Sequence, residues 1–242
     1  MVVQHNLTAM NTNRQLGLTT SAQAKSTEKL SSGYKVNRAG DDAAGLTISE
    51  KMRSQIRGLN KASENAQNGV SLVQTAEGAL NEAHAILQRM NEIATQAAND
   101  TNTSADRGAI KKELTQLSTE LTRISSTTQF NTMNLLDGKF TEKNLQVGAL
   151  AGQRISISIK TMSATALGVK DDQLIVSSFA KAGSTMTKIQ AAISKVSAQR
   201  SDLGAVQNRL EYTINNLNTT SENTSSAESP VSYTHLTLPT IA

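Results

Sequence analysis

The sequence predicts a mainly α-helical protein, an elongated antiparallel helical bundle with one small β-hairpin region. Two runs of apolar residues repeat every seven positions, and residues seven apart fall almost on one line along a helix. Aromatic residues make up only 2% of the chain and Trp is absent, so the core must be built from small aliphatic side chains. Neither proline precedes Pro230, so no proline interrupts a helix before that position.

The two apolar runs predict long helices over about 43–98 and about 182–218 that pack lengthwise along a shared seam. The seam residues are Met52, Leu59, Val73, Leu80 and Leu87 in the first run and Ile189, Val196, Leu203, Leu210 and Leu217 in the second. At 1.5 Å per residue the first seam spans roughly 75 Å, longer than a small domain. The same stripes fit a monomeric three-helix bundle, so periodicity alone does not decide between a monomer and repeated side-by-side association.

A third helix is predicted over about 104–128, running in the reverse direction. The polar stretch 99–106 reads as a turn, and apolar residues then recur at spacings of three and four from Ile110 to Ile124. Asp41 or Asp42 supplies an N-cap for the first long helix, because a carboxylate there accepts a bond from a free backbone N–H.

Beyond Phe130 the period of the apolar residues changes. Leu145, Val147 and Ala149, and then Ile155, Ile157 and Ile159, alternate with polar residues, which predicts a β-hairpin region over about 140–160. After Leu217 the apolar rhythm stops, so an irregular tail is expected over 219–242. Both prolines lie in 230–242, whose composition differs from that of the rest of the chain.

Composition disfavours several functions. With no Cys there is no disulfide and no thiolate site, and no basic leader segment or run of eighteen apolar residues indicates a signal peptide or membrane insertion. The net charge of +4 arises before Asp41, and the chain from there on is neutral. That basic arm lacks the clustered Lys/Arg and aromatics of nucleic-acid-binding segments, so solvated helix surface is the favoured interpretation and no nucleic acid is expected as a partner.

Catalytic or metal chemistry is not expected. His5, His84 and His235 are far apart and have no Cys or carboxylate at ligand spacing, so incidental positions are favoured over metal ligands. The adjacent pair Asp41 and Asp42 suits helix capping better than acid/base catalysis. No phosphate-binding loop is present, and we therefore expect no cofactor and no enzyme.

Four stretches of the chain resemble bacterial flagellin. They are NLTAMNTNRQL at 6–16, the segment around RAGDDAAGL at 38–46, TQFNTMNLLDG at 128–138, and the closing run over 188–218. The resemblance implies a structural subunit of the flagellar filament that is secreted unfolded through the flagellar type III apparatus, without a cleaved leader, and polymerises outside the cell for motility. Its implied partners are other copies of the subunit, an export chaperone and a filament cap.

The resemblance also implies a domain plan. Residues 1–40 match the inner D0-like helical segment and linker, 41–218 match the D1-like bundle, and no D2/D3 insertion is expected between them. In the family an amphipathic helix follows that pairs with the N-terminal segment, whereas 230–242 departs from this pattern and reads as non-native sequence. Without that helix we expect residues 1–35 to be disordered or loosely helical in the monomer, and stable filaments not to form.

The segment over 87–94 resembles the motif through which a vertebrate Toll-like receptor recognises flagellins. The matching positions form a candidate receptor-recognition surface for innate immune recognition: Gln88, Arg89, Glu92, Ile93 and Glu113. Arg89 offers a planar guanidinium of the kind that often dominates interfaces. The alternative is that Arg89, Glu92 and Glu113 are solvated helix charges that pair with one another.

Two other classes of function remain. A hook–filament junction subunit or another helical protein secreted by a type III apparatus would share the long helices. A cytoplasmic coiled-coil signalling module would also share them. The segments at 38–46 and 128–138 favour the filament subunit.

Overall fold

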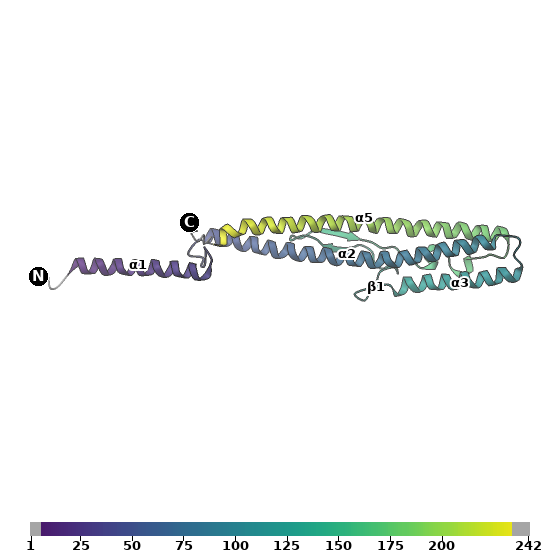
Figure 1. Cartoon of the computed structure of the whole chain (residues 1–242), viewed down its shortest axis with the longest axis horizontal. Helices are drawn as coiled ribbons and strands as arrows, with labels where there is room; N and C mark the ends of the chain where they lie inside the picture. Colours follow the sequence, from purple (N-terminus) through teal and green to yellow (C-terminus); the bar gives the residue numbers. More distant parts are fainter. Residues whose placement is uncertain (1–5, 234–242) are drawn as a thin grey trace, which may run out of the picture. The chain divides into compact units, whose positions relative to one another are not determined.

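The computed structural model describes residues 6–233, and its elements are mostly helices (Figure 1). In chain order they are α1 (Leu7–Ser32), α2 (Ala43–Ala97), α3 (Ser104–Thr127), β1 (Gln129–Phe130), β2 (Met133–Asn134), β3 (Lys143–Gln146), β4 (Arg154–Ile157), α4 (Ala164–Leu167), the 3-10 helix η1 (Asp171–Gln173) and α5 (Phe179–Ser232). The predicted mainly helical class with a small hairpin is confirmed. The starts and ends of α2 and α3 lie within one residue of the predicted bounds.

The chain divides into two compact units. Unit 1 comprises Met1–Asn60 and Asn218–Ala242, and unit 2 comprises Lys61–Leu217. The helices α2 and α5 each contribute a segment to both units.

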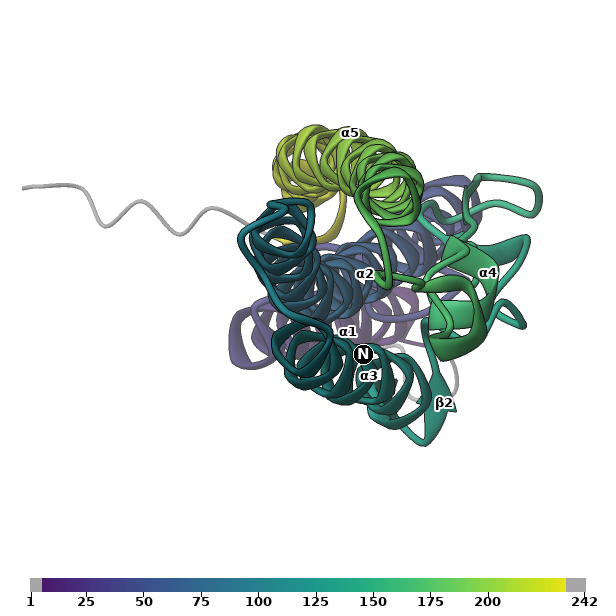
Figure 2. The same cartoon turned by 90° about the vertical axis from the view of Figure 1, so that its right-hand side faces the viewer.

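Unit 2 is a helical bundle in which α2 lies between α5 and α3, with the strands and α4 on one side (Figures 1 and 2). Two pairs fix the direction of α2 against α5. A Cβ at Gly69 would lie 3.3 Å from Leu210 Cδ1, and further along α2 the Glu77 carboxylate lies 3.7 Å from the Arg200 guanidinium. Because position numbers rise on α2 as they fall on α5, the two helices are antiparallel.

The core of unit 2 is aliphatic, as the composition predicts. The largest fully buried side chains on its helices are Leu80, Leu87, Met90, Ile93, Leu114, Leu121 and Ile189. Burying each such side chain is worth about 1.5–3 kcal/mol relative to leaving it in water, so this core stabilises the unit by itself.

The predicted hairpin is formed by β3 and β4, which pair antiparallel with Leu145 opposite Ile155. Ile155 and Ile157 are buried, and their polar neighbours are exposed, as the alternation indicates. Gly69 of α2 admits the hairpin, because a Cβ there would lie 2.3 Å from Leu145 Cδ1.

A second, shorter pair was not predicted. The strands β1 and β2 pair antiparallel around Asn131 and Thr132, both of which have positive φ angles (47° and 63°). Two consecutive residues of this kind make the primed turn that suits a two-residue hairpin. Asn at the first position is the signal that was available in the sequence.

The helix α5 continues to Ser232, so the expectation of an irregular tail from residue 219 is wrong for 219–232. A tertiary contact acts against the low apolar content of this segment. Glu228 is buried against α2 by hydrogen bonds described below. Residues 234–242 lie outside the described residues, as do His5 and His235.

The helix α1 is regular over 26 residues but has no buried residue. The Asn6 side chain caps its start, and Gly33 at φ 73° ends it in the left-handed conformation. The segment is therefore helical from Leu7 to Ser32, and whether it is loosely held in the monomer stays a prediction. The large apolar side chains of α1 are 59–76% exposed. They are Leu7, Met10, Leu16, Leu18 and Leu30.

Candidate functional site

The seam residues define the inside of the bundle. Leu59, Val73, Leu80, Leu87 and all five seam residues of α5 are buried, at 0–6% exposure, whereas Met52 is half-buried. These residues hold the chain together and leave the outer faces of the helices to supply any binding surface.

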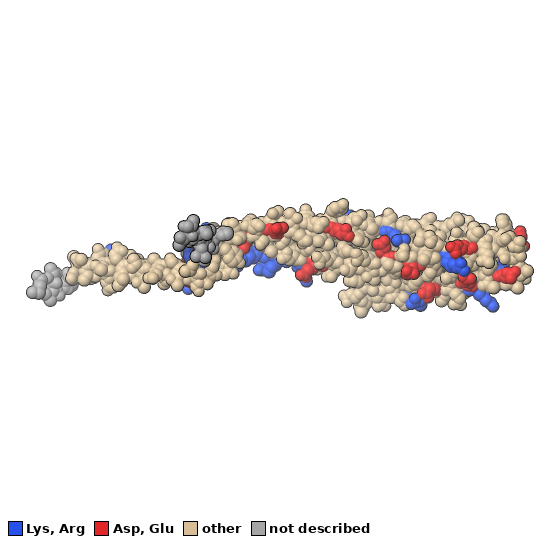
Figure 3. All heavy atoms as spheres, in the orientation of Figure 1, with Lys and Arg blue, Asp and Glu red and all other residues tan. Residues whose placement is uncertain are grey.

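Arg89 joins α2 to α3 at the centre of the candidate recognition surface. Its Nη2 lies 3.0 Å from Glu113 Oε1, and its Nη1 lies 3.3 Å from Glu92 Oε2. Hydrogen bonds to Glu113 and then to Glu92 raise the pKa of Arg89, so it stays charged. Two carboxylates share one guanidinium, and the cluster has a net negative charge. Figure 3 shows acidic and basic groups side by side where α2 and α3 run together.

The remaining predicted recognition residues divide between surface and core. Gln88 is exposed and its Nε2 lies 3.0 Å from Nε2 of His84, one turn earlier. Ile93 is only 1% exposed, so its assignment to a recognition surface is corrected. As an apolar residue on the inner side of α2, it packs in the core with Met90 and Ala97. The exposed surface is Gln88, Arg89, Glu92 and Glu113.

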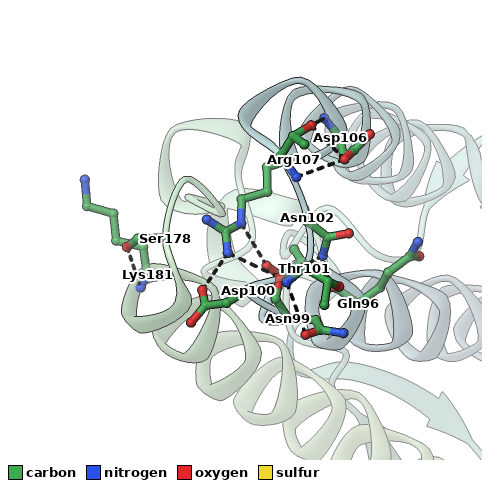
Figure 4. Close-up of polar contacts among 11 residues, drawn as sticks. Gln96, Asn99, Asp100, Thr101, Asn102, Asp106, Arg107, Ser178 and Lys181 are labelled. Atoms are coloured by element: carbon green, nitrogen blue, oxygen red, sulfur yellow. Dashed lines mark hydrogen bonds and ion pairs between the residues drawn. The ribbon is translucent and has the colours of Figure 1, made fainter.

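The turn between α2 and α3 is fixed by Arg107, a role that sequence reasoning missed (Figure 4). Arg107 Nε donates to the carbonyl of Ala97 at 3.2 Å, and Nη2 lies 3.0 Å from Asp100 Oδ1. Asn102 Nδ2 donates to the carbonyl of Gln96 at 2.6 Å. These bonds satisfy carbonyls at the end of α2, which otherwise have no partner within the helix.

The start of α3 carries the capping signal that the sequence contains. Thr103 accepts from the backbone N–H of Asp106, and the Asp106 carboxylate accepts from the backbone N–H of Thr103. At the start of α2, Asp42 Oδ1 accepts from the backbone N–H of Gly45 at 2.8 Å, so Asp42 is the capping residue and Asp41 instead accepts from the linker.

Unit 1 contains a buried polar cluster that the sequence did not reveal. Ser49 Oγ donates to Glu228 Oε1 at 2.6 Å, and Arg53 Nε donates to the same oxygen at 2.8 Å. Burial alone would raise the pKa of Glu228, but the hydrogen bonds from Ser49 and Arg53 outweigh it and hold that pKa below its usual value. The cluster joins the first turns of α2 to the last turns of α5.

Within residues 6–233, no group of His, Asp and Glu side chains is arranged to hold a metal ion. Nor does any helix described there combine the length and apolar character that a membrane crossing requires.

Comparisons with known protein families decide which family these helices represent. The model of the bacterial flagellin N-terminal helical region matches residues 3–141, more than half of the chain, and the model of the C-terminal helical region matches 186–232. The chain belongs to the bacterial flagellin family. Membership in this family of structural proteins supports the prediction that it is not an enzyme.

Two curated flagellins illustrate the similarity. Flagellin of Halalkalibacterium halodurans is 53% identical over 69% of this chain and 61% of its own length. Flagellin of Bacillus subtilis is 51% identical over 71% of this chain and 60% of its own length. The chain thus spans about three fifths of the length of these relatives.

Solved structures agree on the fold. The crystal structure of Bacillus cereus flagellin matches with a TM-score of 0.56 and 30% identity, over 68% of this chain and 94% of that one. A putative flagellar hook-associated protein from Vibrio parahaemolyticus matches with a TM-score of 0.67 at 13% identity, over 79% of this chain and 99% of that one. The second likeness concerns the fold alone.

Proposed function

We propose that this flagellin is a structural subunit of the bacterial flagellar filament, secreted through the flagellar type III apparatus and assembled with other copies outside the cell. The observation that carries this proposal is the uncovered apolar surface of α1, whose large side chains are 59–76% exposed. Large apolar side chains that a helix leaves exposed are available to a partner, and no residue of α1 is buried within residues 6–233. An export chaperone and a filament cap complete the proposed set of partners.

A site-specific label tests this proposal, because the chain has no Cys and one engineered Cys gives a clean signal. Ser201→Cys places it at an exposed position of α5. The variant is expressed in a flagellated bacterium, and a membrane-impermeant maleimide dye is added outside. We expect dye along the filaments, and this result would overturn the expectation from the sequence that stable filaments do not form. Protein that remains entirely inside the cells would contradict both secretion and assembly.

A hook–filament junction subunit is the alternative, and the same experiment separates the two. A junction protein would place the dye in one spot at the base of each filament, whereas a filament subunit places it along the length.

We further propose that the exposed face of α2 and α3 is a ligand of the Toll-like receptor that senses flagellin. Arg89 supports this, since its side chain is 55% exposed and its guanidinium is held in place by Glu92 and Glu113. Replacing Arg89 with Ala should weaken receptor signalling at least about tenfold, as expected for an interface residue of this type. The matched control is Arg123→Ala on α3, another exposed ion-paired arginine. Equal signalling by the two variants would contradict the role of Arg89.

A further inference from the structure

An apolar groove lies between α4, α5 and the chain on either side of the β3–β4 hairpin, all within unit 2. Its volume of about 510 Å³ is in the range of roughly 300–1,000 Å³ that is usual for small-molecule sites. The buried side chains of Met162 and Leu167 line it, together with Ala198 of α5. An aliphatic group placed there would contact protein from several elements at once.

Two lysines line the same groove without a carboxylate beside them. Lys160 and Lys195 are both exposed, and no Asp or Glu is among the lining residues. Lys195 Nζ donates to the carbonyl of Ala166 at 3.2 Å, which leaves two of its three N–H groups for another acceptor. The backbone N–H of Lys160 donates to Gln199 Oε1 at 3.2 Å, whereas its ammonium group has no partner within residues 6–233. We call this the lysine groove.

The surrounding chain is basic as well. Residues 137–170 supply all the lining residues that do not belong to α5, and they contain five basic and two acidic side chains. The two acidic residues are Asp137 and Glu142, and Asp137 Oδ1 already accepts from the backbone N–H of Lys139 at 2.9 Å. The local excess of positive charge is therefore not cancelled by neighbours in the sequence.

A second apolar depression in unit 2 shows a different arrangement. It has a volume of about 260 Å³, and Arg107 and Lys111 are among its lining residues. Each of these cations has a carboxylate of its own: Arg107 Nη2 lies 3.0 Å from Asp100 Oδ1, and Lys111 Nζ lies 2.6 Å from Asp171 Oδ1. The chain thus compensates the cations of the smaller depression and leaves those of the lysine groove available to an anion.

We propose that the lysine groove binds a small amphiphile with one carboxylate, such as a medium-chain fatty acid. The carboxylate accepts charge-assisted hydrogen bonds from Lys160 and Lys195, and the aliphatic chain packs on Met162 and Leu167. This combination of an apolar lining with a few polar groups that fix orientation is typical of small-molecule sites. The inference concerns a ligand of the single chain and does not depend on the proposed function.

Both parts of the ligand should contribute to its affinity. Each methylene that enters the groove should strengthen binding about threefold, so octanoate should bind about tenfold more tightly than hexanoate. Octan-1-ol has the same chain without the charge and should bind at least about fivefold more weakly than octanoate. Equal affinities for octanoate and octan-1-ol would overturn the role of the two lysines.

Protection of lysines from acetylation tests the site on the unaltered full chain. The protein is treated with a trace of an N-hydroxysuccinimide ester of acetic acid at pH 8, with and without octanoate below its micelle-forming concentration. Mass spectrometry of peptides then gives the acetylation rate of each lysine. At a free octanoate concentration four times the Kd, acetylation of Lys160 and Lys195 should slow about fivefold, because only free protein reacts.

Lys181 is the matched control, since it is exposed on α5 and does not line the groove. Its acetylation rate should not change with octanoate. Equal slowing at Lys181 would mean that octanoate coats the protein without a defined site, and it would overturn the inference. Protection of Lys160 and Lys195 by anionic phospholipid vesicles or by a polyglutamate peptide, without protection by octanoate, would overturn it too.

A pair of variants on α5 gives an independent measurement. Ala198→Glu introduces a carboxylate into the lysine groove at an exposed helix position, and it should weaken octanoate binding at least about tenfold by like-charge repulsion and by pairing with the lysines. Ser201→Glu adds the same charge at an exposed position outside the groove and should bind octanoate as the unchanged chain does. Circular dichroism establishes that both variants are folded. Undiminished binding by folded Ala198→Glu would overturn the inference and leave the proposed function standing.

Discussion

Unit 2 and the helix α1 are both helical and both rich in aliphatic residues, yet they differ completely in burial. Unit 2 covers Leu80, Leu87 and Leu114 fully, whereas α1 has no buried residue. The comparison shows that a segment can form a regular helix without burying its apolar side chains. Unit 2 buries its apolar side chains within one chain, whereas those of α1 are left exposed within residues 6–233.

The largest expected effect compares one leucine from each region. Leu87→Ala removes a fully buried side chain and should lower the free energy of unfolding by about 2–5 kcal/mol, because a cavity remains. Leu18→Ala alters a side chain that is 60% exposed, so it should change the free energy of unfolding by less than about 0.5 kcal/mol. Urea unfolding of the full chain followed by circular dichroism measures both. Equal losses would mean that α1 packs on the monomer in solution.

Two glycines of α2 sharpen the comparison within a single helix. Gly69→Ala should destabilise unit 2 by about 1–3 kcal/mol, since its Cβ would collide with Leu145. Gly78 is exposed with open space around it, so Gly78→Ala should stabilise the protein by about 0.5–1 kcal/mol through helix propensity. Thermal unfolding of both variants shows whether each substitution raises or lowers the midpoint temperature. A stabilising Gly69→Ala would refute the close approach of the hairpin.

The polar cluster of unit 1 should respond to pH. Glu228→Gln weakens hydrogen bonds to Ser49 and Arg53 and should cost about 1.5–3 kcal/mol at pH 7. Because the pKa of Glu228 is lowered in the folded protein, its stabilisation is present above the reference value of 4.5 and is lost as pH falls through the folded pKa. The difference in unfolding free energy between the two proteins should therefore narrow below pH 4.5. Glu222→Gln, an exposed position on α5, should show no such narrowing.

The smallest effects concern two arginines of α3. Arg107 is 14% exposed and donates to carbonyls at the end of α2, so Arg107→Ala should destabilise unit 2 by about 1 kcal/mol. Arg123 pairs only with Glu120 at an exposed position, and Arg123→Ala should leave the unfolding midpoint unchanged. If both variants unfold at the same urea concentration, the turn does not depend on Arg107.

Sequence reasoning succeeded where a signal is local. The period of seven located α2 and α5, the spacing from Ile110 to Ile124 located α3, and alternation located the β3–β4 hairpin. It failed where contacts between residues far apart in the sequence determine the structure. The end of α5 looked irregular because the segment has few apolar residues, and its helix is held by Glu228 contacting Ser49 and Arg53, over 170 positions away.

The candidate recognition surface shows the same limit. The motif placed Gln88, Arg89 and Glu92 together on α2, but burial of Ile93 depends on which side of the helix meets the core. The pairing of Arg89 with Glu113 depends on the register of α3 against α2. Neither is fixed by spacing along one helix.

The sequence by itself determined the helices, their apolar seams and the flagellin family, because periodicity, capping and family motifs are written in neighbouring residues. Only the tertiary structure decided which surfaces are covered, that Gly69 admits Leu145, and where Glu228 finds its partners. The physical reason is that burial and polar pairing depend on the approach of segments far apart in the chain, while helix formation depends on residues within a turn or two of one another.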